Sequence, residues 1–152
     1  MSLDRSSADE ETPLLSPAAA DDPKSSIIMS SETFWKIGAS YGAAAVALGA
    51  FGAHGLKKHI TDPARIANWN TAAHYQLIHA VVVLVARDDP VAASLLTAGM
   101  TMFSGSIYAL TLDPARFRFM GPVTPLGGLL MIAGWATLAF GKGGNATRAL
   151  RL

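Results

Sequence analysis

The sequence predicts an all-α integral membrane protein, a four-helix bundle with a disordered N-terminal tail. Four stretches contain no charged residue, and the charges lie almost wholly between them: Ile37 to Leu56, Ile66 to Ala86, Pro90 to Leu112 and Phe119 to Gly141. They contain 20, 21, 23 and 23 residues, and a helix needs about 20 apolar residues to cross a hydrocarbon core of ~30 Å. Charged residues make up 15% of the 152 residues, against roughly 25% in soluble domains. We therefore expect a small multi-pass protein with four spans.

The first span, expected over residues 35–56, consists mainly of glycine and alanine. A soluble alanine-rich helix is the alternative for this segment alone, but four such stretches in one chain favour the membrane. Lipid removes most of the hydrophobic drive between helices, so close packing and hydrogen bonds must hold them together. Gly38, Gly42, Gly49 and Gly52 recur mostly at helical spacing, and we expect them to form a helix-packing surface.

The second and third spans, expected over residues 66–86 and 90–112, each follow an acidic residue and a proline. Asp62-Pro63 provides an N-cap and a preset first position, so it predicts a helix that begins at Pro63. Asp88-Asp89-Pro90 predicts the same for the third span. Only residues 87–89 separate the two charge-free stretches, which predicts a tight antiparallel hairpin.

The fourth span is expected over residues 121–141. Gly121, Pro122 and Pro125 interrupt its beginning, so a regular helix is predicted from Thr124 as N-cap. Gly141 and the glycines that follow end this helix. The transmembrane domain then covers residues 34–142, and residues 143–152 form a short basic tail.

Residues 1–33 are rich in Ser, Ala, Asp, Glu and Pro and lack the apolar content for a core, which predicts a disordered acidic tail. Within it, Glu10, Leu14 and Leu15 resemble an acidic dileucine sorting signal. Such a signal implies binding of a clathrin-type adaptor and delivery to a vacuolar or lysosomal membrane, provided that the tail faces the cytosol. Two leucines without a role in a disordered tail are the plainer alternative.

Four spans place both termini on one side of the membrane. Near the spans, that side holds six Lys and Arg residues and the opposite side holds five. The positive-inside rule therefore favours cytosolic termini by a narrow margin. The organelle stays open between a vacuolar or endosomal membrane, the plasma membrane and a mitochondrial membrane.

Polar side chains at membrane depth are candidate functional residues, and the second span holds many of them. Tyr75, Gln76 and His79 share one side of a helix, which should face protein and not lipid. Histidine is the side chain type that titrates near neutrality, so His79 is a candidate for a proton relay or a ligand site. A neutral His79 hydrogen-bonded to a neighbouring helix is the alternative. The third span supplies three candidate partners: Ser104, Ser106 and Tyr108.

Other chemistries find little support in the sequence. The pairs His54/His59 and His74/His79 are five residues apart, ~140° around a helix, so neither forms a chelating face. The chain has no cysteine, no Asp or Glu inside a span to orient a catalytic base, and no basic patch typical of nucleic-acid binding. We expect no metal, no cofactor, no enzyme activity and no nucleic-acid partner.

Ordered motifs in all four spans resemble one known family. They are Gly49 to Lys57, Trp69-x-Thr71-Ala72-x2-Tyr75-Gln76-x2-His79, Phe103 to Tyr108, and Gly121-Pro122-x-Thr124-Pro125-x-Gly127-Gly128 with Gly134-Trp135. Together they resemble the domain of unknown function 423 family, small four-span proteins also named after transmembrane protein 256. The resemblance covers about residues 34–142 and leaves the acidic tail outside the family pattern.

The resemblance implies a four-helix integral membrane protein of a family found in bacteria and eukaryotes, with no established biochemical activity. It also implies that a set of matched polar positions forms a shared site or packing core: His54, Trp69, Thr71, Tyr75, Gln76, His79, Ser104, Ser106, Tyr108 and Thr124.

Three functional hypotheses follow. The leading one is a non-enzymatic protein, embedded in the lipid bilayer, that acts through helix packing or assembly with itself or a membrane partner. It rests on the abundant small residues and the absence of charge within the spans. The alternative is a small oligomeric transporter or proton-coupled channel lined by Tyr75, Gln76, His79 and Tyr108. A membrane enzyme or haem- or quinone-binding protein is the third.

Overall fold

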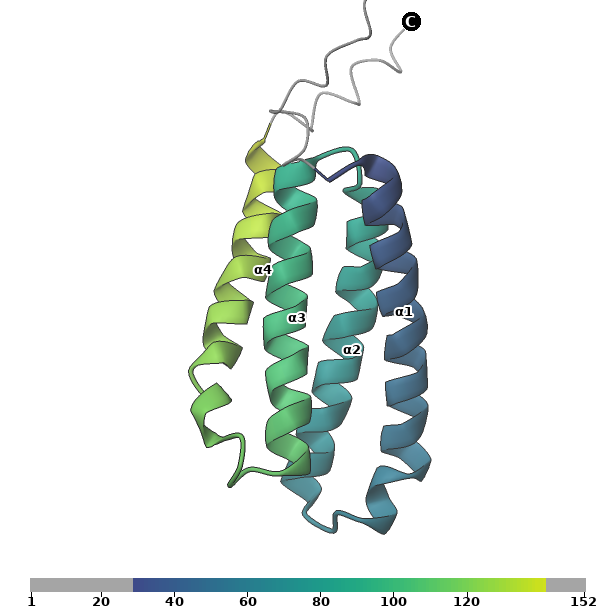
Figure 1. Cartoon of the computed structure of the whole chain (residues 1–152), viewed down its shortest axis with the longest axis vertical. Helices are drawn as coiled ribbons and strands as arrows, with labels where there is room; N and C mark the ends of the chain where they lie inside the picture. The colour runs from purple at the N-terminus through teal and green to yellow at the C-terminus, as the bar shows by residue number, and fades with distance from the viewer. Residues whose placement is uncertain (1–28, 142–152) are drawn as a thin grey trace, which may run out of the picture.

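The computed structural model describes residues 29–141, and all regular secondary structure over that range is helical. Its main helices are α1 (Ser31–His54), α2 (Pro63–Val85), α3 (Pro90–Leu112) and α4 (Val123–Phe140), with two short 3-10 helices, η1 (Leu56–Lys58) and η2 (Arg118–Met120), in the connections. The four main helices run up and down side by side (Figure 1). α1 packs on α2, α2 on α3, and α3 on α4. The predicted all-α, four-helix fold is confirmed.

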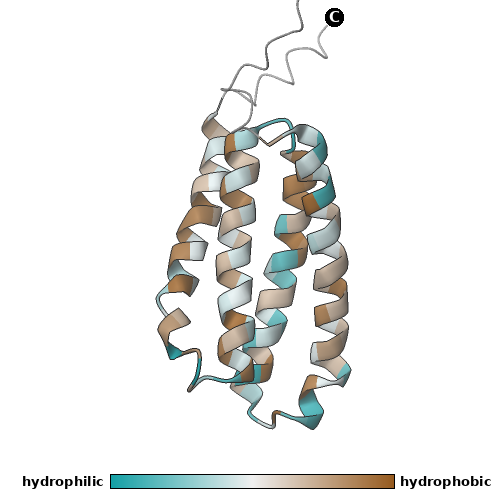
Figure 2. Ribbon diagram, in the orientation of Figure 1, coloured by the Kyte–Doolittle hydropathy of each residue, from teal (hydrophilic) through white to brown (hydrophobic). Residues whose placement is uncertain are grey.

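Three of the helices are long enough by themselves to cross a membrane, and the helices differ in apolarity. α1, α2 and α3 have 24, 23 and 23 residues, which at ~1.5 Å per residue gives ~35 Å, more than the ~30 Å hydrocarbon core. Among the described residues, two segments have the length and composition of a membrane span, Pro90–Leu112 and Arg118–Phe140. α1 is less apolar because it is built from glycine and alanine. α2 is less apolar because hydrophilic residues interrupt it, as Figure 2 shows.

The two Asp-Pro pairs act as predicted. Asp62 Oδ1 accepts a hydrogen bond from the backbone N–H of Ala64 at 2.9 Å, and Asp89 Oδ1 accepts one from Ala92 at 3.0 Å. Proline occupies the first turn of both α2 and α3. Residues 86–89 connect these helices, so the tight hairpin is confirmed.

The N-cap predicted at Thr124 is wrong, and α1 begins before the expected first span. α1 begins at Ser31, three residues before the predicted domain, because Ser30 Oγ accepts a hydrogen bond from Thr33 N at 3.2 Å and caps the helix. α4 begins at Val123, with Pro122 at the N-cap position. Thr124 does not cap it, because its hydroxyl lies 2.6 Å from Ser106 Oγ of α3. Residues 1–28, including the sorting pattern at Glu10, Leu14 and Leu15, and residues 142–152 lie outside the described range.

The four glycines of the first span lie on the side of α1 that contacts α2. A Cβ built at Gly38 would lie 2.8 Å from the Leu84 side chain, and one at Gly52 would lie 2.5 Å from the Trp69 ring. Gly42 and Gly49 are less crowded, with nearest atoms at 3.9 and 4.0 Å. The small residues of α1 therefore face a helix of the same chain.

Glycines bring the backbones of α3 and α4 close together. A Cβ at Gly127 would lie 2.4 Å from the backbone nitrogen of Phe103. A Cβ at Gly99 would lie 2.7 Å from the backbone nitrogen of Met131 and 2.8 Å from the carbonyl oxygen of Gly127. Backbone atoms within a helix cannot move away from an added methyl group as the end of a flexible side chain can. This helix pair therefore depends on glycine at both positions.

Gly127→Ala should lower the free energy of unfolding by about 1–3 kcal/mol, because the new methyl group must push α3 and α4 apart. Gly128→Ala is the matched control, since its Cβ would meet only a side-chain atom of Phe103, at 3.9 Å. It should leave stability unchanged or slightly higher, given the better helix propensity of alanine. Denaturation of the purified proteins in mild detergent, followed by circular dichroism, measures both. Equal stability of the two variants would contradict the close backbone contact.

Candidate functional site

Gln76 joins three helices in the interior of the bundle. Its side chain is 5% exposed. Its Nε2 donates a hydrogen bond to the carbonyl oxygen of Tyr41 in α1 at 3.0 Å, and its Oε1 accepts one from the Tyr108 hydroxyl of α3 at 3.1 Å. The Tyr41 hydroxyl in turn lies 2.7 Å from Thr101 Oγ1 of α3. An unsatisfied polar group in hydrocarbon costs several kcal/mol, so this network makes a buried amide tolerable.

An aromatic cluster lies beside the Gln76 network. Trp69 is 2% exposed, and its ring centroid lies 4.5 Å from that of Tyr108 and 5.5 Å from that of Phe51. Its indole N–H donates to the carbonyl oxygen of Leu48 at 2.8 Å. Trp69 therefore packs α1 and α3 onto α2 while its polar atom is satisfied.

His79 connects α2 to α4. Its side chain is buried, and the indole N–H of Trp135 donates a long hydrogen bond of 3.3 Å to its Nε2. Because Nε2 accepts, the proton of the neutral ring is on Nδ1, which lies 2.8 Å from the carbonyl oxygen of Tyr75. Both ring nitrogens are thus used within the protein. This is the geometry of a neutral histidine bonded to a neighbouring helix.

A half-open cavity of about 370 Å³ lies next to His79, between α2, α3 and α4. Its lining is aromatic and apolar except for the histidine: Tyr75, His79, Phe103, Gly128, Met131, Ile132 and Trp135. The Tyr75 ring stacks on the His79 ring, with centroids 5.8 Å apart and planes inclined by 14°. Tyr75 is itself exposed, so it stands at the rim of this cavity.

The remaining predicted site residues have other surroundings. Ser104, 2% exposed, donates to the carbonyl oxygen of Ala72 in α2 at 2.9 Å and not to Gln76. Ser106 bonds Thr124 of α4. His54 and Thr71 are exposed and do not belong to the Gln76 network.

Three members of these networks were not predicted from the sequence as partners: Tyr41, Thr101 and Trp135. A signal existed for the first, since Tyr41 is the only tyrosine of its glycine- and alanine-rich span. No comparable signal identifies Thr101. Trp135 belongs to a family motif, but its spacing does not show that it reaches His79.

Paired polar groups define the chemistry of this interior. Within residues 29–141, the only buried side-chain nitrogen or oxygen without a hydrogen-bond partner is Thr97 Oγ1. The same part of the chain contains no group of three His, Cys, Asp or Glu residues placed to hold a metal ion. Four of the buried polar side chains serve as hydrogen-bonded links between helices: Gln76, His79, Ser104 and Ser106.

Gln76→Leu keeps a side chain of similar size but leaves the Tyr108 hydroxyl without its acceptor. We expect it to lower the free energy of unfolding by about 1–2 kcal/mol. The double variant Gln76→Leu/Tyr108→Phe removes both partners and should lose less than the sum of the single variants. The coupling should be about 0.6–1.7 kcal/mol, the range for hydrogen bonds between membrane helices. Thr71→Ala, an exposed polar residue of the same helix, is the control. Strictly additive losses would show that the bond between Gln76 and Tyr108 contributes nothing to stability.

Comparison with known proteins identifies the family. Residues 48–128 match the family model described as "Protein of unknown function (DUF423)". The chain is 40% identical over 115 residues to the UPF0382 membrane protein C1782.12c of Schizosaccharomyces pombe, which covers 70% of this chain and 98% of that protein. It is 37% identical over 105 residues to a UPF0382 membrane protein of Haemophilus influenzae (64% and 82% covered) and 37% identical over 114 residues to the UPF0382 membrane protein YwdK of Bacillus subtilis (68% and 90%). No solved structure matches the chain. The resemblance predicted from the motifs is confirmed, and the chain belongs to the DUF423 family of membrane proteins.

Proposed function

We propose that this chain is a non-enzymatic, four-span membrane protein that acts through assembly with itself or with a membrane partner. The observation that carries the proposal is the mutual pairing of the buried polar side chains. Gln76 and His79 use their polar atoms on other residues of the same chain, which supports a structural role for both. Because the polar atoms of Gln76 and His79 are already bonded within the chain, we infer that the protein acts through its outer surface.

Exposed apolar side chains support four spans. Large residues on each of the four helices are more than half exposed, among them Val46 of α1 at 62%, Val81 of α2 at 53%, Val91 of α3 at 59% and Ile132 of α4 at 65%. A soluble bundle would bury much of this surface, whereas lipid covers it at no cost.

The up-and-down arrangement also brings the α2–α3 connection, the N-terminal end of α1 and the C-terminal end of α4 to one end of the bundle (Figure 1). We propose that this end faces the cytosol, in line with the six-to-five count of basic residues.

The edge helices are the proposed assembly surface. α1 packs mainly on α2, and α4 mainly on α3. Both carry large exposed side chains, such as Trp35 at 49% and Phe51 at 41% on α1 and Leu129 at 62% and Trp135 at 47% on α4. Their glycines already face helices of the same chain, so a partner helix would contact these bulky residues.

Single cysteines test the four-span arrangement cleanly, because the chain has no native cysteine. Lys58→Cys and Arg118→Cys should be labelled by an impermeant maleimide from one side of sealed vesicles, and Asp88→Cys from the opposite side. In intact cells, the cysteine at position 88 should be protected until the membrane is opened. Labelling of all three from the same side would contradict four spans.

Cysteine cross-linking tests assembly through the edge helices. Val46→Cys of α1 and Ile132→Cys of α4 should each form a cross-linked product in native membranes, as a dimer of this chain or with one stoichiometric partner. Val81→Cys of the central helix α2 is the control, since it is similarly exposed but not on an edge helix. A monomer without a partner, both in cross-linking and in native mass spectrometry from mild detergent, would refute the proposal.

A further inference from the structure

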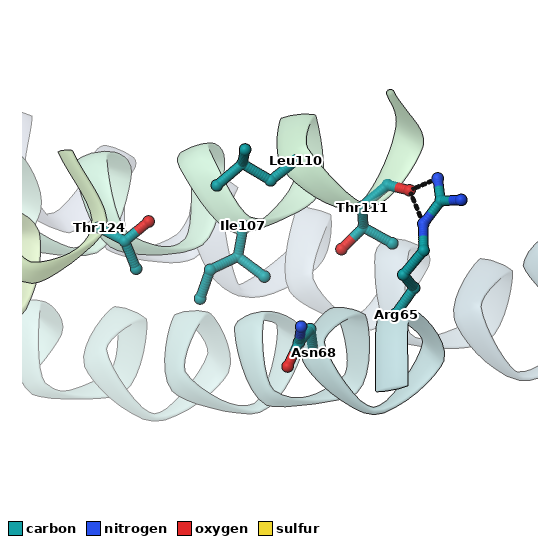
Figure 3. A pocket seen from close by; sticks show the side chains of 6 residues that line it. All are labelled: Arg65, Asn68, Ile107, Leu110, Thr111 and Thr124. Atoms are coloured by element: carbon teal, nitrogen blue, oxygen red, sulfur yellow. Dashed lines mark hydrogen bonds between the residues drawn. The ribbon is translucent and has the colours of Figure 1, made fainter. Parts of the chain in front are cut away.

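A second cavity, of about 300 Å³, lies near one end of the bundle, where α2 begins, α3 ends and α4 begins. Figure 3 shows the six side chains that line it: Arg65, Asn68, Ile107, Leu110, Thr111 and Thr124. α2 contributes the two groups with N–H donors, Arg65 and Asn68, and α3 contributes an apolar wall of Ile107 and Leu110. The cavity is therefore amphipathic, with a cation on one side and aliphatic side chains on the other.

Arg65 is held in place by the backbone of α3. Its Nε donates to the carbonyl oxygen of Thr111 at 2.9 Å, and its Nη2 donates to the same oxygen and to that of Leu112 at 3.1 Å. A cation is favourable at this C-terminal end of a helix. Since a guanidinium has five N–H donors, the two on Nη1 stay available. The ion pairs within residues 29–141 join Lys36 to Glu32 and Arg87 to Asp88, so no carboxylate of the described chain neutralises Arg65.

The end of the bundle around Arg65 is basic. Residues 55–65 and 113–122 contain five basic and two acidic side chains, a net charge of +3: Lys57, Lys58, Arg65, Arg116 and Arg118 against Asp62 and Asp113. At the opposite end, residues 29–36 and 86–89 contain two basic and three acidic side chains, a net charge of −1, and the other four basic residues counted for that side lie outside the described range. A cluster of basic residues raises the local concentration of anions, so the long-range field and the local cavity favour the same kind of ligand.

We propose that this cavity binds the phosphate headgroup of an anionic phospholipid. Free N–H groups of Arg65 and the amide of Asn68 would bind the phosphate oxygens, because guanidinium and phosphate form charge-assisted hydrogen bonds. An acyl chain would follow Ile107 and Leu110 toward the middle of the bilayer. This inference rests on the proposed four-span arrangement, which puts the helix ends at headgroup level.

Native mass spectrometry of the full chain in mild detergent tests the proposal, with dioleoylphosphatidylglycerol and dioleoylphosphatidylcholine as the added lipids. The protein should retain one molecule of the phosphatidylglycerol in preference to the phosphatidylcholine. Arg65→Gln should weaken this retention about tenfold, and Asn68→Ala about threefold, as expected for one charge-assisted and one neutral hydrogen bond. Equal retention of the two lipids would overturn the proposal.

Arg118→Gln is the matched charge control, since Arg118 is exposed at the same end but does not line the cavity. Retention should survive this change; a loss equal to that of Arg65→Gln would show a diffuse basic surface and overturn the site. Arg65 also bonds the end of α3, so its replacement could weaken folding as well as lipid binding. Asn68 is exposed, so Asn68→Ala tests lipid binding without this effect on folding. Excess inorganic phosphate should not displace the lipid, because it lacks the acyl chain. Displacement would identify a free-anion site instead.

Topology labelling keeps this test distinct from the four-span proposal. If cysteines at positions 58 and 118 are labelled from one side and the cysteine at position 88 from the other, the helix ends lie at the membrane surface as required. Loss of lipid retention in that case would overturn the headgroup site alone.

Discussion

A polar side chain inside a membrane protein must find its partner within the protein, and this constraint fixes the setting of the helices. The Gln76 amide reaches a carbonyl oxygen of α1 and a hydroxyl of α3. Successive residues are ~100° apart around a helix, so rotation of α1, α2 or α3 by one position would break at least one of these bonds. Lipid offers no substitute for the lost partner. His79 and Trp135 add a longer bond between α2 and α4, whereas α4 itself packs mainly on α3. The Gln76 amide therefore fixes α1 and α3 relative to α2, and the packing on α3 positions α4.

Close helix packing is what lets such short hydrogen bonds form. Gly99 and Gly127 bring the backbones of α3 and α4 together, and Gly38 and Gly52 bring α1 against α2. The small-residue surface that sequence patterns associate with oligomer contacts is thus used within one chain. Aromatic and branched side chains remain on the outer faces of the edge helices. Assembly would then depend on the packing of large side chains, for which shape matters more than close backbone approach.

Local signals explain which parts of the structure the sequence can predict. Charges between apolar stretches and the two Asp-Pro pairs act over a few residues, so they predict four helices and the starts of α2 and α3. The Thr124 hydroxyl contacts Ser106 of α3 and does not cap α4, and no local pattern contains this contact. The same limit applies to the site. Helical spacing predicts that Gln76 and His79 lie on one side of α2, but it does not predict the depth or the rotation of the neighbouring helix. For this reason Ser104 bonds the carbonyl of Ala72, and Trp135 was missed as a partner.

Arg65 shows how a residue that stabilises the fold can also prepare a binding site. Ordering a long side chain on binding costs free energy, because its rotamer freedom is lost. The carbonyl oxygens of Thr111 and Leu112 already hold the guanidinium in the free protein, so most of that cost falls on folding and not on ligand capture. These hydrogen bonds use only part of the donor capacity of the guanidinium, and its positive charge is not neutralised by the carbonyl oxygens. Gln76 and His79 are already bonded within the protein, so Arg65, a fixed cation with free N–H donors at the end of the bundle, is better prepared for a ligand from outside.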